Sequence, residues 1–186
     1  MTIRIIGGEL KGRKLVTVHG IKTRPTAERV RESIFNILAD SIRGARILDL
    51  FAGTGAMGIE ALSRGAEFVL FADDHKAALS ALAKNIKTCL LQNRAETIKW
   101  NILNNLNIIR SRRPGFNLVF IDPPYNKDMI LPTLSNLAMS QCLENEARLI
   151  IEHSPLEPIP ENLPGFKTSR QRRYGKTLVS FLTYMV

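Results

Sequence analysis

The spacing of apolar and polar positions changes near residue 44, which divides the chain into a short N-terminal part and a longer repeating part. Residues 2–18 alternate loosely, which predicts two short strands with glycine-containing turns between them. Apolar side chains then recur at helical spacing through residues 26–40. We therefore expect a helix in this segment, with Thr26 as its N-cap.

Beyond residue 44, short apolar runs alternate with amphipathic segments. The expected strands cover residues 46–50, 68–72, 96–100, 117–121 and 148–152, followed by a hairpin of strands at 166–172 and 178–184. The expected helices cover residues 56–64, 76–91 and 127–139. Repeated strand–helix units with apolar strands indicate an α/β fold, in which helices cover both faces of a parallel sheet. The final hairpin adds an antiparallel edge.

The first strand of this repeating part runs into a glycine-rich loop. Gly53, Gly55 and Gly58 have the spacing G-x-G-x-x-G, which lets a backbone turn sharply and lets a ligand approach without a Cβ in the way. This spacing by itself is a weak signal, because nicotinamide, flavin and S-adenosylmethionine (SAM) enzymes share it.

Polar residues end the next two strands. Asp73 lies twenty residues after Gly53, where a carboxylate can accept hydrogen bonds from ribose hydroxyls, although it is also suited to a loop or a helix cap. Asn101 ends the third strand, where its amide can contact an adenine edge or cap a helix. Ligands of open α/β sheets bind outside the carboxyl ends of the strands, so both positions are candidates.

A second loop, Asp122-Pro123-Pro124-Tyr125, ends the strand expected at 117–121. The lone pair of an exocyclic amine is delocalised into the base, and acceptors that engage both of its N–H bonds free that lone pair for attack. The Asp122 carboxylate and the Pro123 carbonyl are two such acceptors, while successive prolines fix φ and remove competing donors. Tyr125 offers a ring on which a flipped-out base can stack. An ordinary proline turn is the alternative interpretation.

Positive charge is concentrated at one end of the 186-residue chain. The formal net charge is +9, of which residues 1–31 carry +6. Such concentration is typical of proteins that bind a phosphate backbone, although a solvated basic surface is the alternative. No apolar run approaches the roughly 18 residues of a membrane span, so we expect no membrane partner. The two cysteines and three histidines lack metal or disulfide spacing, which favours a reducing cytoplasm and no metal site.

The glycine-rich loop at residues 53–58 and the Asp122–Tyr125 loop resemble those of class I SAM-dependent methyltransferases that act on planar amino groups. The wider chain is similar to the bacterial 16S ribosomal RNA guanine-N2 methyltransferases of the RsmD type. The residues that carry this wider resemblance are Arg4, Gly8, Gly12-Arg13, Thr23-Arg24-Pro25-Thr26, Arg29-Val30-Arg31-Glu32, Phe35, Glu60-Ala61, Ser63-Arg64-Gly65-Ala66 and Arg173-Tyr174-Gly175-Lys176-Thr177. The chain departs from the family pattern at two positions: Asp73 stands where Glu is usual, and Asn101 where Asp is usual.

The resemblance implies a Rossmann-like, seven-stranded, mostly parallel sheet whose last strand is antiparallel. It implies a single domain over residues 1–186, with residues 1–22 as a basic N-terminal hairpin extension. It further implies SAM as the methyl donor and the N2 of a guanine in 16S rRNA as the acceptor, of the guanine(966) type, during small-subunit assembly. The protein is expected to be a cytoplasmic monomer.

Site residues follow from the matching positions. Those expected to bind SAM are Asp49, Phe51, Ala52, Gly53, Thr54, Gly55, Asp73, Asn101 and Asp122. Those expected to be catalytic are Asp122, Pro123, Pro124 and Tyr125. Those expected to bind RNA are Arg4, Arg13, Lys22, Arg24 and Arg173.

Three other functions fit part of the sequence. A nicotinamide-dependent oxidoreductase explains the glycine spacing but leaves the loop at Asp122 unexplained. An adenine-N6 methyltransferase acting on RNA or DNA shares that loop, and the DNA enzymes usually carry a large target-recognition insertion that this chain lacks. A non-catalytic RNA-binding assembly factor explains the charge but not the intact motifs.

Overall fold

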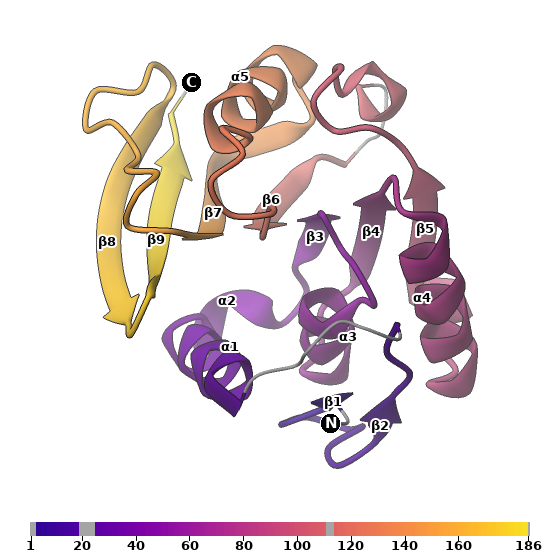
Figure 1. Cartoon of the computed structure of the whole chain (residues 1–186). Coiled ribbons are helices and arrows are strands. Elements are labelled where there is room, and N and C mark those ends of the chain that lie inside the picture. The colour runs from indigo at the N-terminus through magenta and orange to yellow at the C-terminus, as the bar shows by residue number, and fades with distance from the viewer. Residues whose placement is uncertain (1–2, 19–24, 111–113, 186) are drawn as a thin grey trace. The chain divides into compact units, whose positions relative to one another are not determined.

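A computed structural model describes residues 3–18, 25–110 and 114–185 of the chain, with the side chains of helix α1 described from residue 28. The chain forms two compact units, Met1–Trp100 and Asn101–Val186. Figure 1 traces the elements of each. That residues 1–186 make up a single domain stays a prediction.

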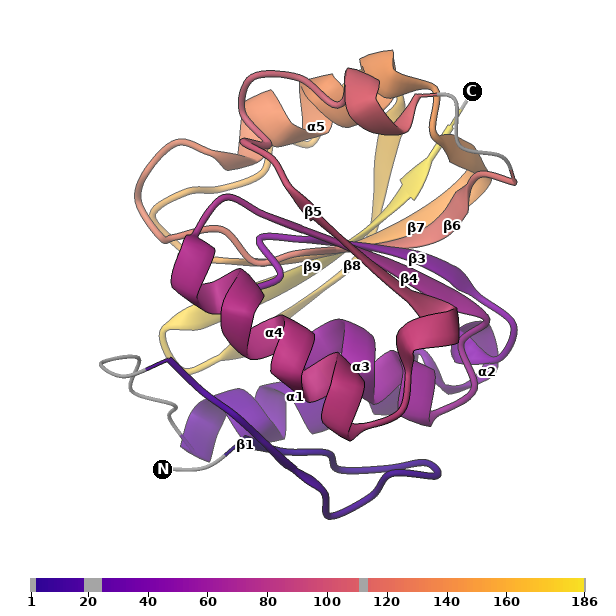
Figure 2. The same cartoon turned by 90° about the vertical axis from the view of Figure 1, so that its right-hand side faces the viewer.

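The first unit is built on three parallel strands. They are β3 (Arg46–Leu50), β4 (Phe68–Asp73) and β5 (Ala95–Lys99), with β4 in the middle. The helices are α1 (Pro25–Ile37), α2 (Ala39–Ile42), α3 (Ala56–Ser63), α4 (Lys76–Thr88) and the 3-10 turn η1 (Gln92–Arg94). Within this unit the α-helices lie on one side of the strands (Figure 2). Apart from Phe68, the apolar side chains of β3 and β4 are buried, which explains why these strands read as continuous apolar runs.

Helix α1 begins one residue before the predicted cap. Pro25 already lies in the helix, so Thr26 is inside its first turn and is not the N-cap. Proline suits the first helical position, because its fixed φ matches the helix and its missing N–H would have had no partner there. The predicted buried face is present, since Val30, Ile34 and Leu38 are each at most 2% exposed.

The second unit is built on four strands. They are β6 (Phe116–Ile121), β7 (Leu143–His153), β8 (Phe166–Tyr174) and β9 (Thr177–Tyr184). Strands β6 and β7 are parallel, and β9 runs antiparallel to both β7 and β8, between which it lies. Helix α5 (Ile130–Ser140) and the 3-10 turn η2 (Asn107–Ile109) complete the unit.

Helix α5 starts three residues later than the prediction of 127–139. Asn126 and Asp128 have φ angles of 57° and 53°, so the chain cannot enter a right-handed helix before them. Strand β7 in turn starts five residues earlier than predicted, with an irregular register against β6 between Phe116 and Leu118.

The strand order of the main sheet is β5-β4-β3-β6-β7-β9-β8. This order, with its antiparallel last strand, confirms the predicted Rossmann-like α/β class. In the part of the chain that the structure describes, no helix combines the length and the apolar character that crossing a membrane requires.

The predicted N-terminal hairpin is present, and it packs onto the first unit. Strands β1 (Ile3–Arg4) and β2 (Lys14–Leu15) pair antiparallel. The hairpin lies beside helices α3 and α4, on the side of these helices away from β3–β5 (Figure 2). Ile5 and Leu15 are 1% and 3% exposed, so the segment contributes to the core of its unit.

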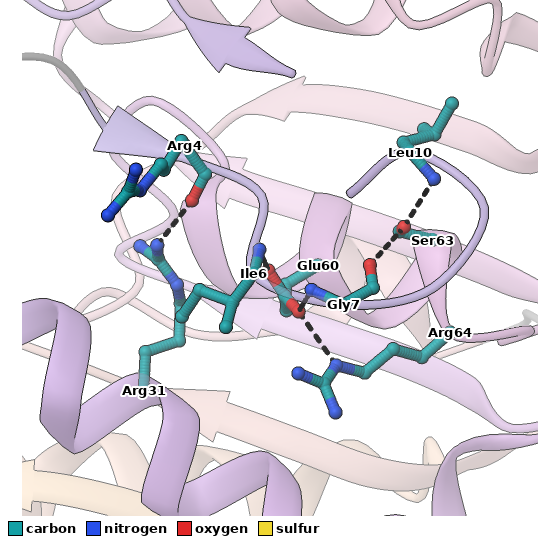
Figure 3. A network of polar contacts seen from close by, with 8 residues as sticks. All are labelled: Arg4, Ile6, Gly7, Leu10, Arg31, Glu60, Ser63 and Arg64. Atoms are coloured by element: carbon teal, nitrogen blue, oxygen red, sulfur yellow. Dashed lines mark hydrogen bonds and ion pairs between the residues drawn. The ribbon is translucent and has the colours of Figure 1, made fainter. Parts of the chain in front are cut away.

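A buried carboxylate on α3 holds this hairpin. Glu60 is fully buried, and its two oxygens accept hydrogen bonds from the backbone N–H groups of Ile6 and Gly7, at 2.7 and 2.8 Å. Arg64, one helical turn further on, donates to the same carboxylate at 2.7 Å (Figure 3). A buried carboxylate is tolerated when its lone pairs are satisfied in this way.

Two further contacts extend this network. The Ser63 hydroxyl donates to the Gly7 carbonyl and accepts from the Leu10 N–H, at 2.6 and 2.9 Å. Arg31 of helix α1 is 7% exposed and donates to the Arg4 carbonyl at 2.7 Å (Figure 3). Burial lowers the pKa of the Arg31 guanidinium, and the negative charge of Glu60 opposes this shift.

We predict that Glu60→Ala lowers the free energy of unfolding by roughly 3–5 kcal/mol. The substitution leaves two backbone N–H groups of the hairpin without acceptors and removes the counter-charge of Arg64. Glu67→Ala is the matched control, because Glu67 pairs with Arg46 at 3.0 Å but its side chain is 59% exposed. Its loss should stay near or below about 1 kcal/mol in the same urea titrations. Equal losses in the two variants would contradict the prediction.

Candidate active site

Asp49, near the end of β3, bonds the backbone at the point where the glycine loop enters helix α3. Its carboxylate is 3% exposed and accepts a hydrogen bond from the Gly58 N–H at 3.0 Å, in the first turn of helix α3. Burial raises the pKa of Asp49 from its ordinary value of 3.8 to about 8; the Gly58 hydrogen bond opposes this shift and the charge of Asp73 adds to it. A positively charged ligand group would favour the ionised form.

Asp73, at the end of β4, holds the other end of the same loop. One carboxylate oxygen accepts from the Gly53 N–H at 2.8 Å, and the other accepts from the His75 N–H at 2.8 Å. A carboxylate offers about four acceptor positions, so each oxygen keeps capacity for a ligand hydroxyl. The predicted ribose contact of Asp73 stays a prediction, beside this structural role.

The three glycines are required for different reasons. A Cβ at Gly58 would lie 2.3 Å from the Phe71 ring, and a Cβ at Gly55 would lie 2.3 Å from a methyl group of Leu82. Gly58 therefore allows close packing of helix α3 on β4, and Gly55, which also has a φ of +83°, allows close packing against helix α4. Gly53 has a φ of +56°, and nothing lies closer than 4.0 Å to a Cβ placed on it. Gly53 thus has the left-handed backbone and open surroundings expected where a ligand approaches the chain.

The rest of the loop contains a strained residue and is held by a buried amide. Phe51 has a φ of 58°, which costs a non-glycine residue about 1–2 kcal/mol. The amide group of Asn85, buried in helix α4, donates to the carbonyls of Thr54 and Val16 at 2.9 and 3.0 Å, while its oxygen accepts from the Val16 N–H at 2.7 Å. Asn85 therefore connects the glycine loop to the N-terminal segment. Ala52 is also buried.

In the second unit, the loop after β6 presents Tyr125 in a fixed orientation. The tyrosine is 36% exposed, and its hydroxyl donates to Glu152 Oε1 at 2.6 Å and lies 3.1 Å from the Thr177 hydroxyl. Burial raises the pKa of the Tyr125 phenol, and the Glu152 carboxylate raises it further, so the phenol keeps its proton. Burial also raises the pKa of Glu152, an effect that the Tyr125 hydrogen bond opposes.

A second carboxylate closes the same loop. Glu157 accepts hydrogen bonds from the backbone N–H groups of Asn126 and Asp128, the latter at 2.7 Å. Pro123 is buried, whereas Asp122 and Pro124 are exposed. The loop therefore presents an exposed Asp122 side chain, while the Tyr125 side chain and the backbone that follows it are held by hydrogen bonds.

Asn101 adopts a local arrangement. Its side-chain oxygen accepts from the Leu103 N–H at 3.0 Å, and the residue is exposed. Asparagine commonly bonds the backbone two residues on in this way, and residues 102–104 form a turn, so Asn101 does not cap a helix. The predicted adenine contact stays a prediction.

The basic residues expected to bind RNA occupy several elements. Arg4 pairs with Glu28 at 3.0 Å, and Arg13 donates to the Thr88 carbonyl at the end of helix α4. Arg173 donates to the Gly175 carbonyl in the β8–β9 turn at 3.1 Å. Each of the three is exposed. Lys22 and Arg24 lie outside the described residues.

Sequence reasoning missed three residues that shape these loops. Glu152 and Glu157 orient the Tyr125 loop, and Asn85 holds the glycine loop. Only Glu152 left a signal in the sequence, because it is an acidic residue near the end of an apolar strand. All three contacts join segments that are far apart along the chain, so local sequence patterns do not reveal them.

The sheet order and the glycine loop after β3 define a class I methyltransferase fold. The family described as "Conserved hypothetical protein 95" matches residues 3–183. The chain belongs to this family, which is that of the RsmD-type proteins and confirms the resemblance.

Individual relatives agree with this membership. The chain is 38% identical over 178 residues to YlbH of Bacillus subtilis (strain 168), to which an rRNA methyltransferase function has been ascribed; the match covers 96% of this chain and 97% of that protein. It is 34% identical over 174 residues to the ribosomal RNA small subunit methyltransferase D of Escherichia coli (strain K12), covering 94% and 86%. The solved structure of yhhF from Escherichia coli, to which a methyltransferase function has been ascribed, matches with a TM-score of 0.86 at 30% identity, covering 100% and 99%.

The raised pKa of Asp49 predicts a pH-dependent stability. The folded protein keeps a proton on Asp49 that the unfolded chain releases above about pH 4, so this group makes folding less favourable as pH rises to about 8. Asp49→Asn abolishes this effect. The stability of the variant relative to the wild type should therefore increase by up to about 1.4 kcal/mol per pH unit between pH 4 and 8.

Urea unfolding at a series of pH values measures this difference. Asp40→Asn, which changes an exposed carboxyl group in helix α2, is the control. A pH-independent difference between Asp49→Asn and the wild type would contradict the raised pKa.

Proposed function

We propose that the protein transfers a methyl group from SAM to the exocyclic N2 of a guanine in the 16S rRNA of the small ribosomal subunit. The observation that carries this proposal is the Asp122–Tyr125 loop, whose aromatic residue is fixed through its hydroxyl while its acidic residue stays exposed. Membership of the RsmD-type family supports rRNA as the substrate class. The choice of guanine N2, and of a position of the guanine(966) type, rests on the resemblance.

The glycine loop of the first unit has the features of a site for the donor. SAM supplies an electrophilic methyl group on a sulfonium, together with a methionine ammonium and ribose hydroxyls. Gly53 leaves open space beside the backbone, Asp73 keeps free acceptor capacity, and Asp49 is a buried carboxyl that an ammonium would ionise. Phe51, Ala52, Thr54 and Gly55, the other loop residues expected to bind SAM, belong to the same loop and would lie beside these groups.

The second unit would present the acceptor amine. The Asp122 carboxylate and the Pro123 carbonyl would each accept one N–H of the guanine N2, with the base stacked on Tyr125. The lone pair freed in this way would form the new bond to the methyl carbon that SAM supplies, with sulfur as the leaving group, and N2 would then lose one proton to water. Hydrogen bonding that strengthens as charge develops on nitrogen lowers the barrier, and this is the role assigned to Asp122.

Methyl transfer tests the proposal directly. Labelled SAM is incubated with small subunits purified from cells that lack this gene, and the modified nucleoside is identified by mass spectrometry. N2-methylguanosine is expected. Methylation of adenine would support the adenine-N6 alternative, and RNA binding without any transfer would support the assembly-factor alternative.

We predict that Asp122→Asn lowers kcat by on the order of 100-fold or more while SAM affinity changes only a few-fold. The amide keeps the size of the side chain but loses the negative charge that stabilises the developing positive charge on nitrogen. Asp128→Asn, an exposed position further along the same loop, is the matched control and should keep wild-type kcat. Loss of activity in both variants would indicate that the loop is merely sensitive to charge.

Two substitutions at Tyr125 distinguish the role of its ring from that of its hydroxyl. Tyr125→Ala removes the stacking surface, worth about 1–3 kcal/mol, so KM for the RNA should rise by roughly 5- to 150-fold. Tyr125→Phe keeps the ring but leaves Glu152 without its donor, so the increase should be smaller. Steady-state kinetics with both variants decides this, and equal KM values for Tyr125→Ala and the wild type would exclude stacking on this residue.

A further inference from the structure

The last 25 residues of the chain, 162–186, contain five lysines and arginines and no acidic residue. Four of the five lie on the edge strand β8, and the fifth follows it in the turn to β9. All five are exposed. They are Lys167, Arg170, Arg172, Arg173 and Lys176. Among the described residues, no carboxylate forms an ion pair with Lys167, Arg170 or Arg172. The strand thus carries positive charge that none of the described carboxylates neutralises in an ion pair.

The pairing of β8 with β9 sorts these residues onto two faces. Lys167, Arg170 and Arg172 lie opposite Thr183, Phe181 and Val179. Residues directly opposite each other in an antiparallel pair share a face, and alternate residues of one strand do so as well. All three basic residues therefore lie on the face of the odd-numbered residues of β9, and we name these three the basic stripe.

A bulge brings Lys167 onto this face. Strict alternation along β8 would place Lys167 opposite to Arg170 and Arg172. The register shifts between Thr168 and Arg170, so that Ser169 is the extra residue, and its hydroxyl donates to the Phe181 carbonyl at 3.0 Å. One extra residue moves each residue that precedes it in the strand to the opposite face of the sheet.

The same face carries the groups that anchor Tyr125. Thr177, whose hydroxyl lies 3.1 Å from that of Tyr125, is an odd-numbered residue of β9, and Glu152 of β7 pairs with Val179 on this face. Arg173 pairs with Leu178 and lies on the opposite face. The basic stripe therefore belongs to the face of the sheet that holds the proposed base-stacking residue, and Arg173 does not.

We propose that the basic stripe binds the phosphates of the RNA strand that flanks the target nucleotide, with Arg170 and Arg172 as the main contacts. This inference rests on the proposed function, because it takes Tyr125 as the place where the target base stacks. Adjacent residues on one face of a strand are about 7 Å apart, so the two arginines present a row of cations to an extended polyanion. Phosphate contacts of this kind fix the position of the strand and leave recognition of the base to the loop.

Direct RNA binding tests the stripe. The probe is a fluorescein-labelled, single-stranded RNA oligonucleotide that contains guanine, titrated with the full chain at several salt concentrations. The double variant R170Q/R172Q should bind roughly 10- to 100-fold more weakly, and its plot of log K against log salt should be shallower by roughly 1.4. R170K/R172K keeps both charges and should regain most of the affinity.

Two further comparisons separate the stripe from general charge. K84Q/K87Q removes two exposed positive charges from helix α4 and should keep wild-type affinity. R172Q should weaken binding more than R173Q, because the two residues lie on opposite faces of the same strand. The proposal is overturned if R170Q/R172Q binds like the wild type, or if R172Q and R173Q lose equal affinity.

Charged residues on an edge strand also prevent strands of other molecules from pairing with it. If that were their only role, R170Q/R172Q would aggregate in light-scattering measurements while its monomeric fraction kept wild-type affinity, which would overturn the proposal.

Methyl transfer by the wild type distinguishes failure of the stripe from failure of the proposed function. If the wild type transfers methyl groups and the double variant keeps wild-type RNA affinity, only the role of the basic stripe is refuted. If the double variant binds RNA more weakly and the wild type transfers no methyl group, only the proposed function is refuted.

Discussion

Carboxylates that accept the backbone N–H groups of a loop are the interaction on which the functional parts of this protein depend. Glu60 holds the N-terminal hairpin, Asp49 and Asp73 hold the two ends of the glycine loop, and Glu157 holds the loop after Tyr125. Loops have few backbone partners of their own, and an unpaired buried N–H is costly. A charged acceptor supplies a strong partner, so each of these loops is fixed by side chains from neighbouring elements.

This arrangement has an electrostatic cost that differs from place to place. At Glu60 the nearby arginines compensate the buried charge. Asp49 forms no ion pair with any residue that the structure describes, and burial favours its protonated form. A buried carboxyl that is easily ionised by an arriving cation is suited to a ligand that carries an ammonium group. If the proposed function holds, Asp49 and Asp73 would combine a structural role with a ligand-binding role.

The loops that would bind the methyl donor and the acceptor base are stabilised in different ways. The glycine loop relies on left-handed backbone, close helix–strand packing and buried acids. The loop of Asp122 relies on two prolines and on side chains from β7, β9 and the connector that follows β7. In both, rigidity comes from the supporting elements, so that the exposed groups keep their geometry without help from a ligand.

The sequence by itself determined the order of strands and helices, the bounds of β3, the glycine loop and the Asp122–Tyr125 loop, because these depend on local periodicity and on residue types with strong backbone preferences. Only the tertiary structure decided which side chains support them. The partners of Tyr125 and of the Gly53 N–H come from distant segments. Likewise the facing of Lys167 and Arg173 depends on a bulge and on the register with β9, which are set by pairing between strands and not by either strand alone.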